Sequence, residues 1–181
     1  MGYKKMKLAN AWMDPTFMKQ VISAKIYQEY LPTGESNLVK LFSQGNYVGM
    51  YVNDESINKQ FLDKHFDEKN GPLFKCDNID RFCDTAGAPS AMPPNLNFLG
   101  DDSTLYYNSY DMKSDHGWTE LVDLIRTIVY EFQNIDSVLN VDRTLWAFAA
   151  NQTLQNLDCY NTYYVHNYYF CLLYTSDAAD D

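Results

Sequence analysis

The residues best suited to chemistry lie near the carboxyl end of the chain, where Asn167 follows Asp158 by nine positions. A carboxylate can accept the proton of an attacking hydroxyl group or orient that group. The carbonyl oxygen of an asparagine side chain can bind a hard cation such as Mg²⁺. The two side chains could therefore divide the work of activating a nucleophile and holding a metal. In the simpler alternative, which the spacing alone favours, Asp158 caps a turn and Asn167 bonds to loop backbone.

Two neighbouring residues in this stretch also carry reactive groups. Cys159 stands beside the carboxylate, but the sequence places no histidine to activate it, so we expect a packed free thiol. His166 can orient the loop through its ring nitrogens or can simply pack.

The apolar pattern predicts the elements that position these residues. In the first part of the chain it predicts two helices, a hairpin and a strand. The predicted elements are a helix that starts at Asp14-Pro15 and ends near Tyr30, strands at 37–43 and 47–52 joined by the turn Gln44-Gly45-Asn46, a helix with Ile57, Phe61, Leu62 and Phe66 capped by Asp54 or Ser56, and a strand at 73–76.

The second part of the chain is predicted to be mainly helical. An irregular loop over 77–104 precedes a strand at 105–110, and helices follow at 118–133 and at about 141–154. A polar and aromatic loop then carries Asp158 and Asn167 and leads into a strand that begins at Tyr168. The order of elements predicts the α+β class.

Composition excludes several functional classes. The 181 residues are 46% hydrophobic and 21% charged, which suits one packed domain. The net charge of -10 argues against a nucleic-acid partner, because such binding depends on cationic side chains. No apolar run approaches the roughly 20 residues of a membrane-spanning helix, and the amino-terminal stretch lacks the pattern of a signal peptide. Four cysteines in 181 residues are too few for a disulfide scaffold, and none stands in a C-x-x-C pair, so a zinc site is not predicted either.

The last residues, 171–181, read CLLYTSDAADD and do not continue the aromatic pattern before them. This string resembles the conceptual translation of a sequencing adapter. We therefore expect 171–181 to be a non-native tail and 1–170 to be a partial domain that was cut before its natural end. A native acidic terminus without fixed structure is the alternative.

Several stretches resemble motifs of the CotH family, the spore-coat protein H group of atypical protein kinases. Matches cover nearly all of 1–170. They are KLANAWMDPTFMK at the first helix start, GNYVGMYVNDESINKQFL in the hairpin and second helix, GPLFK at the following strand, GWTELVDLI and VDRTLWAFAANQTLQNLDCY in the later helices and loop, and HNYYF in the last strand. The Asn-x-Asp with its downstream His-Asn-Tyr-Tyr is the most specific part.

The order of elements predicts a β-rich part that contains one helix, followed by a helical part. The resemblance implies that these parts form an atypical protein-kinase-like fold, incomplete here. It implies transfer of the γ-phosphate of ATP to Ser or Thr hydroxyls of a protein substrate, with Mg²⁺ or Mn²⁺ as the metal. By matching motif, Asp158 would be the catalytic carboxylate, Asn167 a metal ligand, Lys75 the phosphate-contacting lysine, and Glu55 the partner of Lys75 or a metal ligand. From the residues alone, Lys75 could equally be a solvated strand-end lysine, and Glu55 a carboxylate at a helix N-terminus.

One family motif is not reached. A Trp-Asp-x-Asp/Asn segment, which supplies a further metal-binding acid, follows the His-Asn-Tyr-Tyr segment in the family, whereas here residue 171 begins the adapter-like string. We therefore expect a kinase parent and an inactive chain as given. The alternative function is a non-catalytic interaction domain of a spore coat or cell surface, since family members occur in spores and on secreted or surface proteins.

Overall fold

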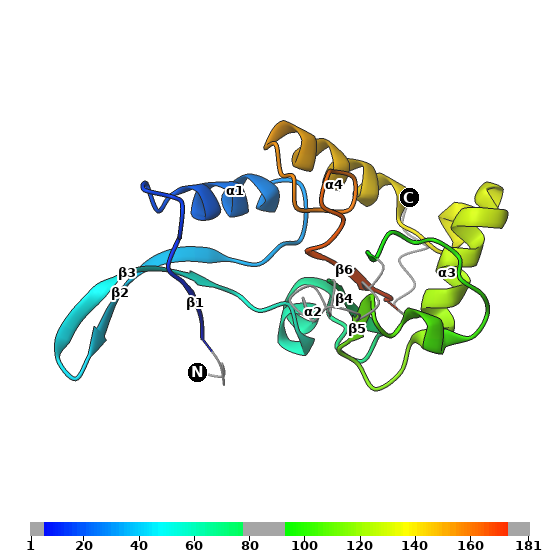
Figure 1. Cartoon of the computed structure of the whole chain (residues 1–181), viewed down its shortest axis with the longest axis horizontal. Coiled ribbons are helices and arrows are strands. Elements are labelled where there is room, and N and C mark those ends of the chain that lie inside the picture. Colours follow the sequence, from blue (N-terminus) through cyan, green and yellow to red (C-terminus); the bar gives the residue numbers. More distant parts are fainter. Residues whose placement is uncertain (1–5, 78–92, 174–181) are drawn as a thin grey trace, which may run out of the picture. The chain divides into compact units, whose positions relative to one another are not determined.

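The computed structural model describes residues 6–77 and 93–173. The chain divides into two compact units, Met1–Asp67 and Glu68–Asp181, and Figure 1 shows the elements of each. Each unit contains a three-stranded antiparallel sheet together with helices. The mixed content and the small antiparallel sheets confirm the α+β class.

The sheet of the first unit is built on the predicted hairpin. Strands β2 (Ser36–Ser43) and β3 (Asn46–Asp54) pair, and the short β1 (Lys7–Ala9) adds to the other edge of β3. At the turn, Gln44 and Gly45 have φ angles of 51° and 83°. A two-residue hairpin turn needs this left-handed backbone, which glycine adopts without a Cβ clash. The turn at Gln44-Gly45-Asn46 is therefore confirmed.

Over the described residues 6–67, the first unit carries the helices α1 and α2, and both begin later than predicted. Helix α1 spans Lys19–Gln28, so the predicted start at Asp14 is wrong. Asp14 instead caps a turn that precedes the helix. Its carboxylate accepts hydrogen bonds from the backbone N–H of Thr16 at 3.1 Å and from that of Lys19 at 2.9 Å. Phe17, with a φ of 59°, interrupts helical geometry between the turn and the helix.

Helix α2 spans Lys59–Phe66 and is capped by Asn58, not by Asp54 or Ser56 as predicted. The Asn58 side chain accepts the backbone N–H groups of Gln60 and Phe61 at 2.8 and 3.2 Å. Asp54 ends β3 and accepts a hydrogen bond from the Ser36 hydroxyl at 2.8 Å, because strand pairing continues to that residue.

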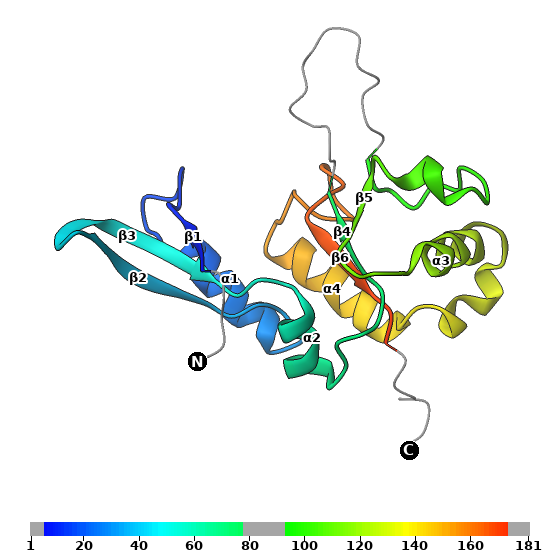
Figure 2. The same ribbon diagram turned by 90° about the horizontal axis from the view of Figure 1, so that it is seen from below.

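In the second unit, β4 (Leu73–Cys76) is the central strand of a sheet with β5 (Tyr110–Met112) and β6 (Tyr168–Cys171), as Figure 2 shows. The predicted strand at 105–110 is largely wrong. Ser103–Tyr106 forms the 3-10 turn η1, capped by the Asp102 carboxylate. Tyr106 is fully buried, and its hydroxyl donates to the Gly100 carbonyl at 2.9 Å, which fixes the turn.

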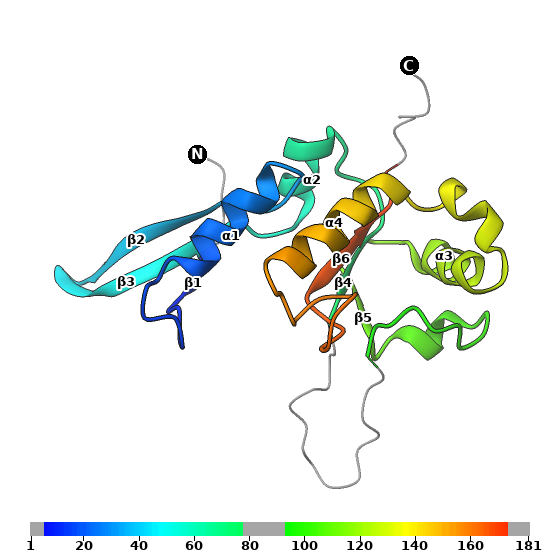
Figure 3. The same cartoon turned by 90° about the horizontal axis from the view of Figure 1, so that it is seen from above.

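Helices α3 (Trp118–Tyr130) and α4 (Val141–Thr153) confirm the two predicted long helices, although α3 gives way to the 3-10 turn η2 (Phe132–Ser137) before residue 133. The core forms between α3 and one face of the sheet. Figure 3 shows this helix and the sheet. Its buried members are Phe74, Cys76, Leu96, Tyr106, Tyr110, Leu121, Val122 and Ile125. Since side chains alternate along a strand, Lys75 points to the opposite face.

Two glycines permit close contacts beside β4. A Cβ on Gly117, whose φ is 138°, would lie 2.6 Å from Pro72 Cβ. A Cβ on Gly71 would lie 1.9 Å from the carbonyl oxygen of Leu172, whose N–H donates to Pro72 at 2.9 Å. Cys171 and Leu172 thus continue the pairing of β6 beyond the predicted end of the native chain, whereas 174–181 and the part of the predicted loop at 78–92 lie outside the described residues.

Candidate functional site

The pairing of β4 with β6 brings two of the predicted site residues to one end of a sheet. Lys75 pairs with Tyr169, and Cys76 pairs with Tyr168. The residues that come next along the two antiparallel strands are Asp77 and Asn167. Both therefore lie at the same end, which we call the Asp77 end of the sheet.

The loop between α4 and β6 leads into this end and is held by its own hydrogen bonds. Asn156 Oδ1 accepts the backbone N–H of Asp158 at 3.1 Å, and the N–H of Tyr164 donates to the carbonyl of Leu157 at 2.8 Å. Asn161 ties the loop to α4, because its Oδ1 accepts the side-chain amide of Asn151 at 3.1 Å. The loop is thus folded back on itself next to the helix that precedes it.

Asp158 presents its carboxylate to solvent from this loop, with 57% of its side chain exposed. His166 Nε2 lies 3.5 Å from Asp158 Oδ1, and the histidine ring is largely buried. Asn167, the next residue, is exposed and has a φ of 58°. Asparagine tolerates this left-handed conformation better than most residues. The loop therefore brings the predicted catalytic carboxylate into contact with the residue beside the predicted metal ligand.

Lys75 does not extend freely into solvent. Its ammonium lies 2.6 Å from Asp77 Oδ2, and the two side chains are 33% and 17% exposed. The hydrogen bond to Asp77 raises the pKa of Lys75 against the opposing effect of burial. Burial raises the pKa of the neighbouring Tyr169, although Lys75 opposes this shift. At neutral pH Lys75 is thus a fixed cation beside a neutral phenol.

Glu55 belongs to the other unit and lies between the end of β3 and α2, so it is not part of a helix N-terminus. Its side chain is 7% exposed, and its carboxylate lies 3.2 Å from Lys64 Nζ and 3.6 Å from His65 Nε2. It also accepts the backbone N–H of Glu35 at 3.1 Å. Burial acts to raise the pKa of Glu55, but these hydrogen bonds and the Lys64 charge outweigh it and lower the pKa.

A model of the CotH kinase protein family matches residues 1–180 of the chain. The chain belongs to the CotH kinase family. The match covers nearly the whole sequence, so the resemblance inferred from the motifs is confirmed. No curated protein matches the sequence at a significant level. CotH membership implies a kinase-like protein, with the use of a nucleotide and a metal that such proteins share.

The donor set of this CotH chain fits a metal that arrives with a nucleotide. Asp158 and Asn167 offer hard oxygen atoms, which Mg²⁺ prefers. In the described ranges, no three His, Cys, Asp or Glu side chains gather into a group that could hold a metal alone. Mg²⁺ in phosphoryl-transfer sites is commonly held by one or two protein oxygens together with phosphate oxygens. Asn167 at the Asp77 end and Asp158 in the adjoining loop would supply protein oxygens for that second arrangement.

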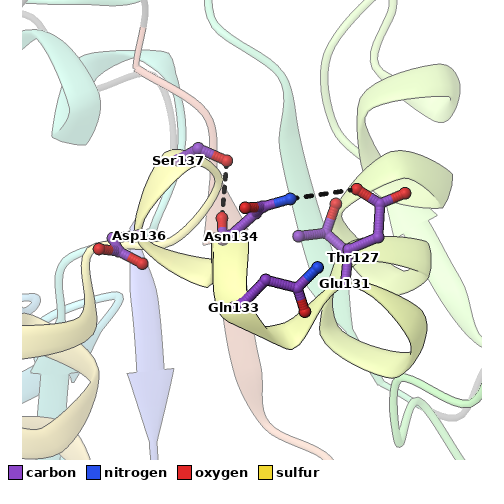
Figure 4. Close-up of a pocket in the computed structure, with 6 residues that line it drawn as sticks. All are labelled: Thr127, Glu131, Gln133, Asn134, Asp136 and Ser137. Atoms are coloured by element: carbon purple, nitrogen blue, oxygen red, sulfur yellow. Dashed lines mark hydrogen bonds between the residues drawn. The ribbon is translucent and has the colours of Figure 1, made fainter.

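Other features of the described residues are given no part in this chemistry. Cys159 is buried, and its thiol donates to the carbonyl of Asn156 at 3.3 Å, consistent with the expected packed thiol. An open hollow of about 480 Å³ lies along the end of α3 and η2 and contains none of the predicted site residues (Figure 4). Over 6–77 and 93–173, no helix has the length and apolar character needed to cross a membrane.

The sequence interpretation did not include Asp77. The sequence contains a signal for it. Lys75 and Asp77 stand two positions apart at the end of a predicted strand, and residues at that spacing share one face of the strand. The structure therefore brings Lys75, Asp77 and Asn167 to one end of a sheet, beside the loop that holds Asp158. Glu55 is placed in a separate charge cluster of the first unit.

Proposed function

We propose that this CotH kinase family chain is part of an atypical Ser/Thr protein kinase with a kinase-like fold. The proposed reaction transfers the γ-phosphate of ATP to a hydroxyl of a protein substrate. The hydroxyl oxygen forms a bond to the γ-phosphorus while the bond to the β–γ bridging oxygen breaks, and ADP leaves. The hydroxyl proton passes to a carboxylate of the protein.

Asp158 is the proposed proton acceptor. Its exposure allows a substrate hydroxyl to approach, and its contact with His166 restrains the carboxylate. A positioned base of this kind contributes typically about 10²–10⁴-fold to a proton-transfer step. The side chain must be close to the transferred phosphate, and its place in the loop that enters the Asp77 end supports that role.

Asn167 is the proposed metal ligand and Lys75 the proposed phosphate contact. Mg²⁺ or Mn²⁺, when bound, would neutralise phosphate charge. Lys75 carries a compact positive charge on β4. This strand pairs with β6, which begins immediately after Asn167. The role proposed for Glu55, as partner of Lys75 or metal ligand, has less support because Lys64, His65 and Glu35 already occupy its carboxylate.

One observation carries the proposal. The exposed Asp158 is restrained by His166 in a loop that runs directly into β6, and the partner strand of β6 carries Lys75. This arrangement supports a site in which the carboxylate and the amide of one loop act together with a lysine from a strand that is distant in the sequence.

The test is nucleotide binding by the full chain, because binding reports on Lys75 and Asn167 independently of the transfer step. We expect a fluorescent ATP analogue to bind in the presence of Mg²⁺, and Lys75→Gln to weaken that binding. Asp158→Asn should bind the nucleotide with nearly unchanged affinity but should abolish any transfer of labelled phosphate to casein. A chain that binds no nucleotide at millimolar concentration would contradict the proposal and favour the non-catalytic interaction domain.

A further inference from the structure

Asp77 is a poorly exposed carboxylate to which neither the motifs nor the proposed reaction gives a role. It follows β4 directly, and its Oδ2 lies 2.6 Å from Lys75 Nζ. Lys75 and Asp77 stand on the same face of the strand, so the pair forms without distortion of the backbone. The short distance and the limited exposure of both side chains distinguish this pair from an ordinary mobile ion pair on the surface.

Two other carboxylates that could be considered as partners of Lys75 have partners of their own. Asp111 is the residue opposite Lys75 on β5, and its carboxylate bonds to Lys113. Glu55 is matched within the first unit by Lys64 and His65. Asp77 is therefore the carboxylate whose contact with Lys75 the structure shows directly.

We propose that Asp77 is the positioning residue of Lys75 and fixes its ammonium for contact with nucleotide phosphates. This inference rests on the proposed kinase function. An ammonium group has three N–H donors, so the bond to Asp77 leaves two for phosphate oxygens. The lysine side chain has a flexible stem of four carbons. Without Asp77, the stem would have to be ordered when the nucleotide binds, and this would reduce the affinity for the nucleotide. Asp77 thus takes the role that the family resemblance would give to Glu55.

The first measurement tests the pair itself and needs no nucleotide. The full chain is prepared with isotope-labelled lysine, and the Lys75 ammonium is titrated by NMR. Because the Asp77 bond raises the pKa of Lys75, Asp77→Asn should lower it toward the ordinary lysine value. Asp111→Asn is the matched control on the neighbouring strand and should have a smaller effect. An unchanged Lys75 titration in Asp77→Asn would overturn the inference.

The second measurement tests the role, with the fluorescent ATP analogue and Mg²⁺ as the probe. Asp77→Asn should weaken binding by about tenfold, which corresponds to a coupling inside the usual range for residues in contact. Asp77→Glu should recover part of the loss, and Asp111→Asn should bind like the wild type. In a Lys75→Gln background, Asp77→Asn should change the affinity by less than about twofold, because its effect passes through the lysine.

The outcomes separate the inference from the proposed function. Wild-type binding with an unchanged Asp77→Asn affinity overturns the inference alone. A tenfold loss that persists in the Lys75→Gln background also overturns it, since the effect would then be structural. A wild-type chain that binds no nucleotide overturns the proposed function and, with it, the role of Asp77 in nucleotide binding. Thermal unfolding of each variant identifies any change that acts through stability.

Discussion

Gly71 lies against the backbone of Leu172. Replacing Gly71 with alanine therefore tests whether the chain beyond residue 170 packs as part of the folded second unit. In Gly71→Ala, the new Cβ would lie 1.9 Å from the carbonyl oxygen of Leu172. Real Cβ atoms do not come so close, and the obstacle is backbone rather than a flexible side chain. Either the end of β6 or the turn before β4 must therefore move.

The size of the effect follows from the cost of overpacking, about 1–3 kcal/mol for an added methyl group in a packed region. The backbone of Gly71 does not have a positive φ, so the substitution adds no left-handed strain. Without Leu172, Gly71→Ala should be neutral or should stabilise the unit by about 0.4–1 kcal/mol, through a smaller entropy of the unfolded chain. The two backgrounds should thus differ by about 1–4 kcal/mol.

Urea unfolding followed by tryptophan fluorescence measures this difference. Trp12 is 80% exposed and can be replaced by phenylalanine, so that Trp118 and Trp146 report on the second unit. The free energy of unfolding is measured for Gly71→Ala and for the unsubstituted protein, each in the full chain and in a chain that ends after Cys171. The shorter chain keeps the pairing of Leu73 with Cys171. Equal costs of Gly71→Ala in the two backgrounds would refute the packing of Leu172 against this turn.

Three further predictions concern packing, capping and pH. Gly117→Ala should destabilise the second unit by about 2–5 kcal/mol in both backgrounds, since it combines a φ of 138° with a contact of 2.6 Å to Pro72; a cost that vanishes in the shortened chain would contradict this. Asn58→Ala should lower the stability of the first unit by about 1 kcal/mol through loss of the α2 cap, and this loss should appear as faster hydrogen exchange in α2. Asn58→Asp, which keeps an acceptor at the cap, should retain most of the wild-type stability. The folded-state pKa of Glu55 is below its ordinary 4.5, so its stabilisation of the first unit is present above that pH and is lost as the pH falls through the folded pKa. Hydrogen exchange of β3 should therefore accelerate less on acidification in Glu55→Gln than in the wild type, and an equal acceleration would show that Glu55 is not the group responsible.

Local sequence signals predicted the elements that depend on local geometry. The hairpin was predictable because Gln44 and Gly45 supply the left-handed turn, and the last two helices because their apolar residues repeat with helical spacing. The strand predicted at 105–110 failed for a tertiary reason. Tyr106 is typical of strands, yet the chain buries it from a turn that Asp102 caps and the Gly100 carbonyl holds.

The candidate site was predictable in part for the same reason. Asp158 and Asn167 share a loop, so their proximity is partly encoded in the local sequence. The place of Lys75 beside that loop depends on the pairing of β4 with β6, two segments far apart in the chain. No periodicity encodes such pairing, and the motif resemblance pointed to Lys75 instead. The engagement of Glu55 by Lys64 and His65 likewise depends on how the loop after β3 folds against α2.

The position of β4 in the middle of its sheet has a consequence for biosynthesis. Both neighbours of β4 are made after it, and its contact with β6 waits until Cys171 has left the ribosome. The hairpin of β2 and β3 needs only adjacent residues, so it can close much earlier. Until β6 arrives, one edge of β4 presents unpaired backbone groups, and a nascent chain of this kind would depend on chaperones or fast elongation to avoid association through that edge.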